Sequence, residues 1–170
     1  SFDYDRTAGP NRKATESKPR SVSGNADYRR LITKALCLLK EHKPDRAITA
    51  FHQALAILPD HNQFDHHYYL GIAFQQTGQL EKAADCYRKA IGFNPNSDEK
   101  YLALASCLQA QSDYHGAEQC YQQVLHKDPS HPKAAFSLGT LYLHQNDIHN
   151  ALKWLLRARD AQPDWGLLQN

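Results

Sequence analysis

The sequence has 170 residues, of which 41% are hydrophobic and 22% are charged, as is ordinary for a soluble globular chain. Its formal net charge of +2 is too small for the basic surface that nucleic-acid binding needs, so we expect no nucleic acid among its partners. No stretch reaches the roughly 20 consecutive apolar residues of a membrane-spanning helix, so we expect no membrane insertion.

Residues 1–27 differ in composition from everything that follows. They are rich in Ser, Pro, Gly and charged residues, and their few apolar residues show no period. Such a segment buries too little apolar surface to offset its chain entropy, which predicts a flexible N-terminal tail. Its aromatic stretch Phe2–Tyr4 is a candidate to pack against an apolar surface of the remaining chain.

From Tyr28 onward the sequence repeats with a period of 34 residues. Pro95, Pro129 and Pro163 are spaced by this period, and Pro59 lies 36 residues before Pro95. Sliding the sequence by the period aligns four units, with Asn62 and Gln63 as an insertion after the first. The units are residues 28–61, 64–97, 98–131 and 132–165.

The aligned positions share size and polarity. The eighth position is always small and the twentieth is always alanine, which lets two antiparallel helices approach closely. The eleventh and twenty-fourth positions are large and apolar and fill the space beside that contact. Proline near the end of each unit terminates its second helix. We therefore expect two helices per unit, with turns near residues 43–44, 77–79, 112–113 and 146–147.

The stretch L-G-I-A-F-Q-Q-T-G-Q-L-E-K-A-A-D-C-Y-R-K-A-I-G-F-N-P, from Leu70 to Pro95, resembles a tetratricopeptide repeat (TPR) throughout, and L-G-T-L-Y carries the same core again. The resemblance implies an all-α fold, a right-handed superhelical solenoid of antiparallel helix pairs. Two features depart from the family pattern. Lys34 occupies the seventh position of the first unit, where the other units have leucine. The position that usually holds tryptophan contains Leu31, His67, Tyr101 and Ala135.

In the family that this sequence resembles, the first helix of each repeat lines a concave groove that holds a peptide or a helix. Positions 2, 5, 9, 12 and 13 of each unit then face the groove. The candidate groove residues are Ile32, Leu36, Tyr68, Ile72, Gln75, Leu102, Ser106, Gln109, Phe136, Thr140 and Leu143. Their apolar centre and polar edges suit a ligand with hydrophobic anchors. The alternative for each residue singly is that it packs between neighbouring first helices.

One subgroup of the family holds the acidic tails of heat-shock chaperones with a clamp of Lys, Asn and Arg. The corresponding positions here contain Ile32, Leu36, Tyr69, Glu99 and Ala103. Lys133 matches the clamp lysine only if the frame starts one repeat later. We therefore expect no carboxylate clamp.

No catalytic or metal-binding pattern is evident. None of the close histidine pairs has the i, i+4 spacing or the cysteine partners of a zinc site, and no nucleophile or phosphate-loop motif occurs. We expect no enzyme activity, no metal and no cofactor. Four irregularly spaced cysteines favour unpaired thiols buried among helices and a cytoplasmic location. They are Cys37, Cys86, Cys107 and Cys120.

The leading hypothesis is an adaptor or scaffold that presents a peptide-binding groove to a protein partner. The alternatives are a regulatory or substrate-docking module of a larger enzyme, and a secretion-type chaperone. Residues 166–170 are interpreted as the truncated start of a capping helix or of a further repeat, which would leave Trp154 and Leu155 uncovered. Self-association through the tail or through this end is therefore a further expectation.

Overall fold

The computed structural model describes residues 22–58 and 65–162. Within these ranges the chain forms eight α-helices and no strand. The helices are α1 (Val22–Lys40), α2 (Pro44–Ile57), α3 (His66–Gln76), α4 (Leu80–Phe93), α5 (Asp98–Ala110), α6 (Tyr114–Lys127), α7 (Pro132–His144) and α8 (Ile148–Ala161).

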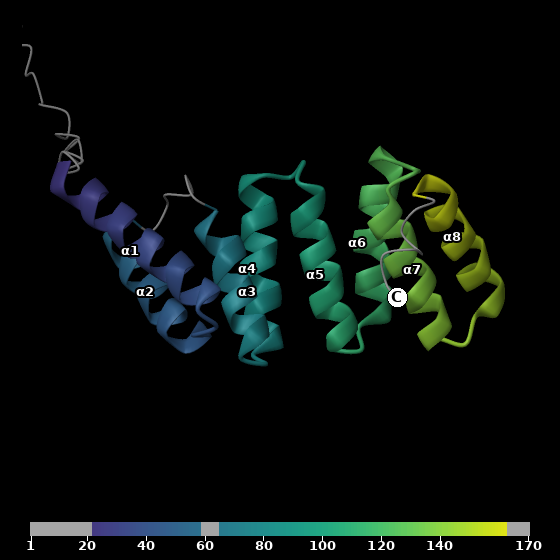
Figure 1. The fold of residues 1–170 in the computed structure, drawn as a ribbon, viewed down its shortest axis with the longest axis horizontal. Coiled ribbons are helices and arrows are strands. Elements are labelled where there is room, and N and C mark those ends of the chain that lie inside the picture. The colour runs from purple at the N-terminus through teal and green to yellow at the C-terminus, as the bar shows by residue number, and fades with distance from the viewer. Residues whose placement is uncertain (1–21, 59–64, 163–170) are drawn as a thin grey trace, which may run out of the picture.

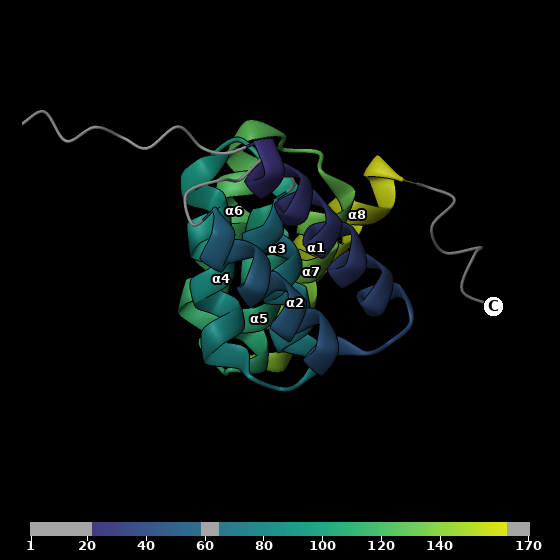
Figure 2. The ribbon, with the colours of Figure 1, turned by 90° about the vertical axis from the view of Figure 1, so that its left-hand side faces the viewer.

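Consecutive helices pack as hairpins that stand side by side in one row, from α1 and α2 at one end to α7 and α8 at the other (Figure 1). Seen along the row, the helices form a single stack (Figure 2). Extensive backbone contact occurs between helices adjacent in sequence, and α1 also makes a small contact with α3. The all-α solenoid predicted from the repeats is therefore confirmed.

The four predicted turns lie between the helices of each hairpin. Each turn has one residue in the left-handed backbone region: His42 (φ 56°), Gly78 (φ 75°), Ser112 (φ 64°) or Asn146 (φ 61°). The residue after each of them donates its backbone N–H to a carbonyl near the end of the preceding helix. At the N-terminal end, α1 begins at Val22 and therefore includes residues that the sequence assigned to the tail. Residues 1–21, with the Phe2–Tyr4 stretch, lie outside the described part of the chain.

The small residues at positions eight and twenty are buried inside the hairpins. All four alanines at position twenty are completely buried, as are Ala35 and Ala105 at position eight. The glycines at position eight are packed still more closely. A Cβ atom on Gly71 would lie 2.6 Å from Cε1 of Tyr87, and one on Gly139 would lie 2.8 Å from Cγ of Leu155. In the second and fourth repeats, position eight therefore packs closely against position twenty-four of the same hairpin.

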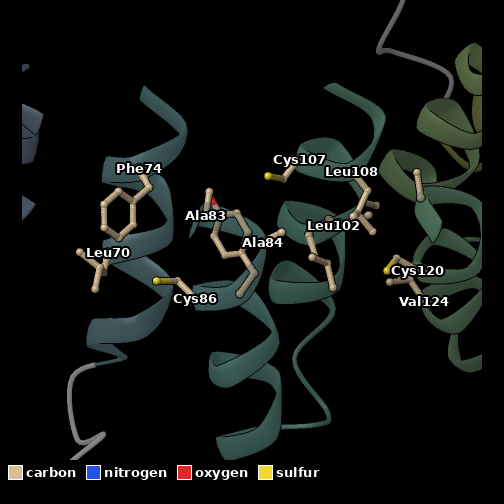
Figure 3. Close-up of a cluster of buried hydrophobic side chains, with 14 of the residues drawn as sticks. Leu70, Phe74, Ala83, Ala84, Cys86, Leu102, Cys107, Leu108, Cys120 and Val124 are labelled. Atoms are coloured by element: carbon tan, nitrogen blue, oxygen red, sulfur yellow. The ribbon is translucent and has the colours of Figure 1, made fainter. Parts of the chain in front are cut away.

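Polar contacts join one hairpin to the next. The Tyr28 hydroxyl lies 2.8 Å from Nδ1 of His66, which is completely buried. Farther along the row, the backbone oxygen of Leu80 accepts hydrogen bonds from the Cys107 thiol at 3.2 Å and from the Gln111 amide at 2.8 Å. Figure 3 shows Cys107 of α5 directed toward α4. These bonds help to fix how α3 and α5 lie on the hairpins before them.

All four cysteines are unpaired, as their spacing predicted. Burial raises the pKa of Cys86 and of Cys120 to about 11, so both thiols stay protonated near neutral pH. Cys37 differs because its side chain is exposed on α1. The expectation of a buried role is therefore wrong for Cys37 and correct for the other three.

Candidate binding surfaces

The eleven predicted groove residues all lie on the first helices of the hairpins, α1, α3, α5 and α7, but they differ widely in exposure. Ile32 and Leu102 are buried, with 1% and 8% of their surface exposed, and both belong to the hydrophobic core. At the other extreme, Phe136 and Leu143 are 43% and 46% exposed, and Ser106 is also exposed. The half-buried members are Leu36, Tyr68, Ile72, Gln75, Gln109 and Thr140.

The fifth position explains part of this spread, because it packs one first helix against the next. Tyr68 of α3 donates its hydroxyl to the Glu99 carboxylate of α5 at 2.9 Å. Burial, together with this hydrogen bond, raises the pKa of Tyr68 above its ordinary value, so the hydroxyl remains a donor at all physiological pH values. Ile32 and Leu102 occupy the same position and are covered almost completely, so they offer a ligand little surface.

A glutamine–tyrosine pair recurs in the two middle repeats. Tyr87 donates to Oε1 of Gln75 at 2.8 Å, and Tyr121 donates to Oε1 of Gln109 at 3.2 Å, one repeat later. Each bond joins position 24 to position 12 of the same repeat and fixes the rotamer of the glutamine. The amide groups of these two glutamines are therefore held in defined orientations on the first helices.

The free ends of these two glutamines have different surroundings. Nε2 of Gln75 donates to the Ser106 hydroxyl of the next repeat at 3.2 Å. The corresponding hydroxyl for Gln109 is that of Thr140, which instead donates to the backbone oxygen of Ser137 at 2.8 Å. A hydrogen bond from Gln75 to Ser106 therefore joins α3 to α5, whereas the corresponding Thr140 hydroxyl donates to the backbone of its own helix.

A hollow of about 400 Å³ lies beside Gln109, between α5 and α7. Its lining combines exposed or half-buried polar groups with the Tyr114 ring. The lining residues are Ser106, Gln109, Ala110, Tyr114 and His144. Four of these five occupy groove-facing positions of the third and fourth repeats, so the hollow belongs to the predicted groove. Sequence reasoning had placed Ser106 and Gln109 there, and it assigned no role to Tyr114.

A second hollow, of about 630 Å³, lies among α2, α3 and α4, away from the predicted groove positions. Its floor is apolar, with Ile48, Leu70 and Phe74, and charged side chains including Lys82 and Asp85 stand around it. No prediction pointed to this hollow.

Comparison with known families agrees with the repeat pattern. Two sequence models described as tetratricopeptide repeat match this chain, one over residues 64–97 and the other over residues 102–164. The chain belongs to the tetratricopeptide-repeat family. No curated protein sequence matches it.

Solved structures of other TPR proteins share the fold. A crystal structure of MamA superposes with a TM-score of 0.74 at 18% identity, covering 82% of this chain and 81% of that one. MamA from Desulfovibrio magneticus RS-1, residues 41 to the end, gives 0.75 at 18% identity, covering 81% of this chain and 77% of that one. A tetratricopeptide repeat protein from Parabacteroides merdae ATCC 43184 gives 0.75 at 19% identity, covering 81% of this chain and 54% of that one.

Membership of the TPR family supports a protein–protein interaction scaffold in general terms. Among residues 22–58 and 65–162, no group of three or more His, Cys, Asp or Glu side chains could hold a metal ion. No helix of the described part is long and apolar enough to cross a bilayer.

Proposed function

We propose that this TPR chain is a non-enzymatic scaffold whose concave surface binds a peptide or a helix with hydrophobic anchors. The surface is formed by the groove-facing positions of α1, α3, α5 and α7. The observation that carries the proposal is the hollow between α5 and α7, because it is a concave site at the positions where the repeat pattern predicted a ligand.

The chemistry of this surface suits a peptide segment that carries both apolar and polar groups. Leu36 and Ile72 are half-buried apolar side chains at the ninth position and can contact hydrophobic anchors of a ligand. In the hollow, the Gln109 amide is oriented by Tyr121 and can donate to a ligand carbonyl group. A preoriented donor loses less entropy on binding than a mobile one, which favours specific recognition of a peptide backbone.

Peptides selected from a random library of about 12 residues against the 170-residue chain provide the test. A Ser106→Trp substitution fills the hollow and should weaken the selected peptides at least tenfold, as measured by fluorescence anisotropy. The matched control is Gln123→Trp, which places the same side chain on an exposed position of α6. Both variants must first show the unfolding midpoint of the unmodified chain. Equal peptide affinity for the two variants would exclude the groove as the binding site.

A further inference from the structure

The two glutamine–tyrosine pairs of the middle repeats leave hydrogen-bond donors on residues that line one hollow. In the second repeat, Tyr87 donates to Oε1 of Gln75, and Nε2 of Gln75 donates to the Ser106 hydroxyl of α5. Ser106 lines the hollow of about 400 Å³ between α5 and α7. Because the Ser106 oxygen already accepts a hydrogen bond from Gln75, its hydroxyl hydrogen is left to donate.

The third repeat adds a second donor to the lining of the same hollow. Oε1 of Gln109 accepts from Tyr121 at 3.2 Å, which leaves the NH₂ end of this amide group to donate. The hydroxyl of Thr140, at the position that Ser106 occupies one repeat earlier, donates to its own helix. In the described part of the chain, neither Nε2 of Gln109 nor the Ser106 hydroxyl donates to a protein acceptor.

The spacing of the two donors suits a single acceptor oxygen. Ser106 and Gln109 are three residues apart on α5, which places them on the same helical face with their Cβ atoms about 5–6 Å apart. A carbonyl oxygen has two lone pairs and can accept from both side chains at once. The third repeat therefore offers a site for one carbonyl oxygen of a ligand.

The charge of the lining favours an uncharged ligand group. None of the five lining residues is Lys, Arg, Asp or Glu. Ala110 and His144 are the last residues of α5 and α7, so the hollow lies at two helix ends that carry partial negative charge. A carboxylate would leave water here without a counter-charge, and an ammonium group would meet the two donors.

A side-chain amide matches this lining better than a main-chain carbonyl group does. Its oxygen can accept from Ser106 and Gln109, and its NH₂ group can donate to the Tyr114 hydroxyl or the His144 imidazole on the remaining wall. It also stands at the end of a short apolar stem and can enter a hollow between two helices. A main-chain carbonyl group must bring both of its neighbouring residues with it.

We propose that the hollow between α5 and α7 is a specificity site that takes a glutamine or asparagine side chain of the bound peptide. This inference rests on the proposed groove function and adds the chemistry of one ligand side chain. Tyr121 is a positioning residue in this site, because it acts through Gln109. Gln75 and Tyr87 are positioning residues that act through Ser106.

The test uses the library-selected peptides of about 12 residues that bind the unmodified chain and that Ser106→Trp weakens. We expect these peptides to share a glutamine or asparagine at one position. Replacing a shared glutamine by glutamate or by methionine keeps the length of the side chain and removes the uncharged amide. Each replacement should weaken binding at least tenfold, because a site built to hydrogen-bond an amide rejects analogues that lack it. Anisotropy titrations at about pH 8, where imidazole groups are mostly neutral, give the affinities.

Variants of the chain separate the hydrogen bonds from general packing. Gln109→Met removes one donor and should lower the preference for the glutamine peptide over the methionine peptide about fivefold or more. Tyr121→Phe keeps the buried ring and releases Gln109, so the preference should fall while the methionine peptide binds as before. The matched control is Tyr142→Phe, which removes a hydroxyl that donates to Glu118, outside the lining of the hollow. This control should retain the full preference.

Three results would overturn the proposal and leave the groove function standing. One is equal affinity for the glutamine, glutamate and methionine peptides, and another is a preference for glutamate, since the hollow would then take a carboxylate. The third is a set of selected peptides that Ser106→Trp weakens but that share no amide residue, since a main-chain group or an aromatic ring would then be the occupant. Equal effects of Tyr121→Phe and Tyr142→Phe on the preference would contradict the positioning role of Tyr121. If Ser106→Trp and Gln123→Trp bind all selected peptides equally, the groove function fails and this proposal fails with it.

Discussion

The ammonium group of Lys100 lies 2.8 Å from the carboxylate of Asp65, and the two residues come from different repeats. Lys100 is only 2% exposed on α5, whereas the Asp65 side chain is 44% exposed just before α3. The backbone of Asp65 is left-handed (φ 49°), a region that Asn also tolerates. The pair therefore links the start of α3 to α5 with one partner buried and the other in contact with water.

This asymmetry predicts unequal effects of removing the two partners. Asp65→Asn leaves a buried ammonium group without its counter-charge and should cost about 3 kcal/mol of unfolding free energy. Lys100→Met leaves a carboxylate that water can solvate and should cost less than about 1 kcal/mol, because an apolar side chain of similar length replaces the lysine. Urea unfolding of both variants measures the difference. Equal losses would show that burial of Lys100 does not determine the energetics of the pair.

Adding one methyl group at Gly139 should destabilise the last hairpin. Its Cβ would meet Leu155 at 2.8 Å, and the Leu155 backbone nitrogen lies 3.1 Å away, so the helices must separate. We expect Gly139→Ala to cost about 1–3 kcal/mol. The control is Gly92→Ala on α4, where nothing lies within 4 Å of the added Cβ and helix propensity should raise stability by up to about 1 kcal/mol. Thermal melts that shift in the same direction for both would contradict this packing.

Larger side chains at position twenty should lower the stability of the helix pairs. Ala83 and Ala117 are completely buried between the helices of their hairpins. Replacing either by leucine should lower the unfolding free energy by about 1–3 kcal/mol through overpacking. Circular dichroism melts provide the measurement, with Ala161→Leu at the exposed end of α8 as the control. An unchanged melting temperature for both core variants would mean that these positions do not form the crossing.

His67 should make stability fall on mild acidification. Burial, with a smaller effect of Lys89, lowers its pKa below the ordinary 6.5, and its ring lies 4.3 Å from that of buried His66. Above pH 6.5 the residue is neutral in both folded and unfolded chains, so its full contribution is present. Below that value the unfolded chain binds the proton first, and stability decreases until the folded-state pKa is reached. Urea midpoints between about pH 7 and pH 5 should therefore fall.

A variant series isolates this effect. His67→Phe removes the titrating group and keeps an aromatic ring that can stack on Phe93, so its stability should depend less on pH. His126→Phe changes an exposed histidine on α6 and should retain the pH dependence of the unmodified chain. Identical slopes for the two variants would assign the acid sensitivity to other groups.

The thiols should react at very different rates in the folded chain. Cys37 is exposed, whereas Cys86, Cys107 and Cys120 are buried and burial raises the pKa of each. At about pH 8 we expect Ellman's reagent to modify Cys37 rapidly and the other thiols only after unfolding, because the thiolate is the reactive form. Mass spectrometry of the labelled peptides identifies the sites. Rapid labelling of Cys107 would show that its contact with Leu80 opens readily.

The repeats and their helix pairs could be predicted because each depends on side-chain size at fixed spacing. A small residue at position eight and alanine at position twenty allow two helices to pack closely, and in the second repeat Gly71 packs against Tyr87 while Ala83 is completely buried. Position five was harder to interpret. Its side chain can face the groove or the next first helix, and the choice depends on how neighbouring hairpins are rotated, which the period does not specify. Ile32 and Leu102 were therefore assigned to the groove although they are buried.

Phe136 shows the same limitation, because it occupies the same fifth position but is exposed. Phe136 was expected in the groove because it follows the repeat pattern, yet the residues of its column in the first and third repeats are covered by neighbouring helices. Its exposure comes from its place in the last hairpin of the described row. The repeat pattern identified Phe136 as a fifth-position residue, and the order of the hairpins determined how much of its side chain is exposed.

Because backbone contacts run mainly between consecutive helices, the solenoid should open from its ends before its middle. Within the described part of the chain, the hairpin of α7 and α8 packs mainly on α6, so its amides should exchange with solvent sooner than those of α4 and α5.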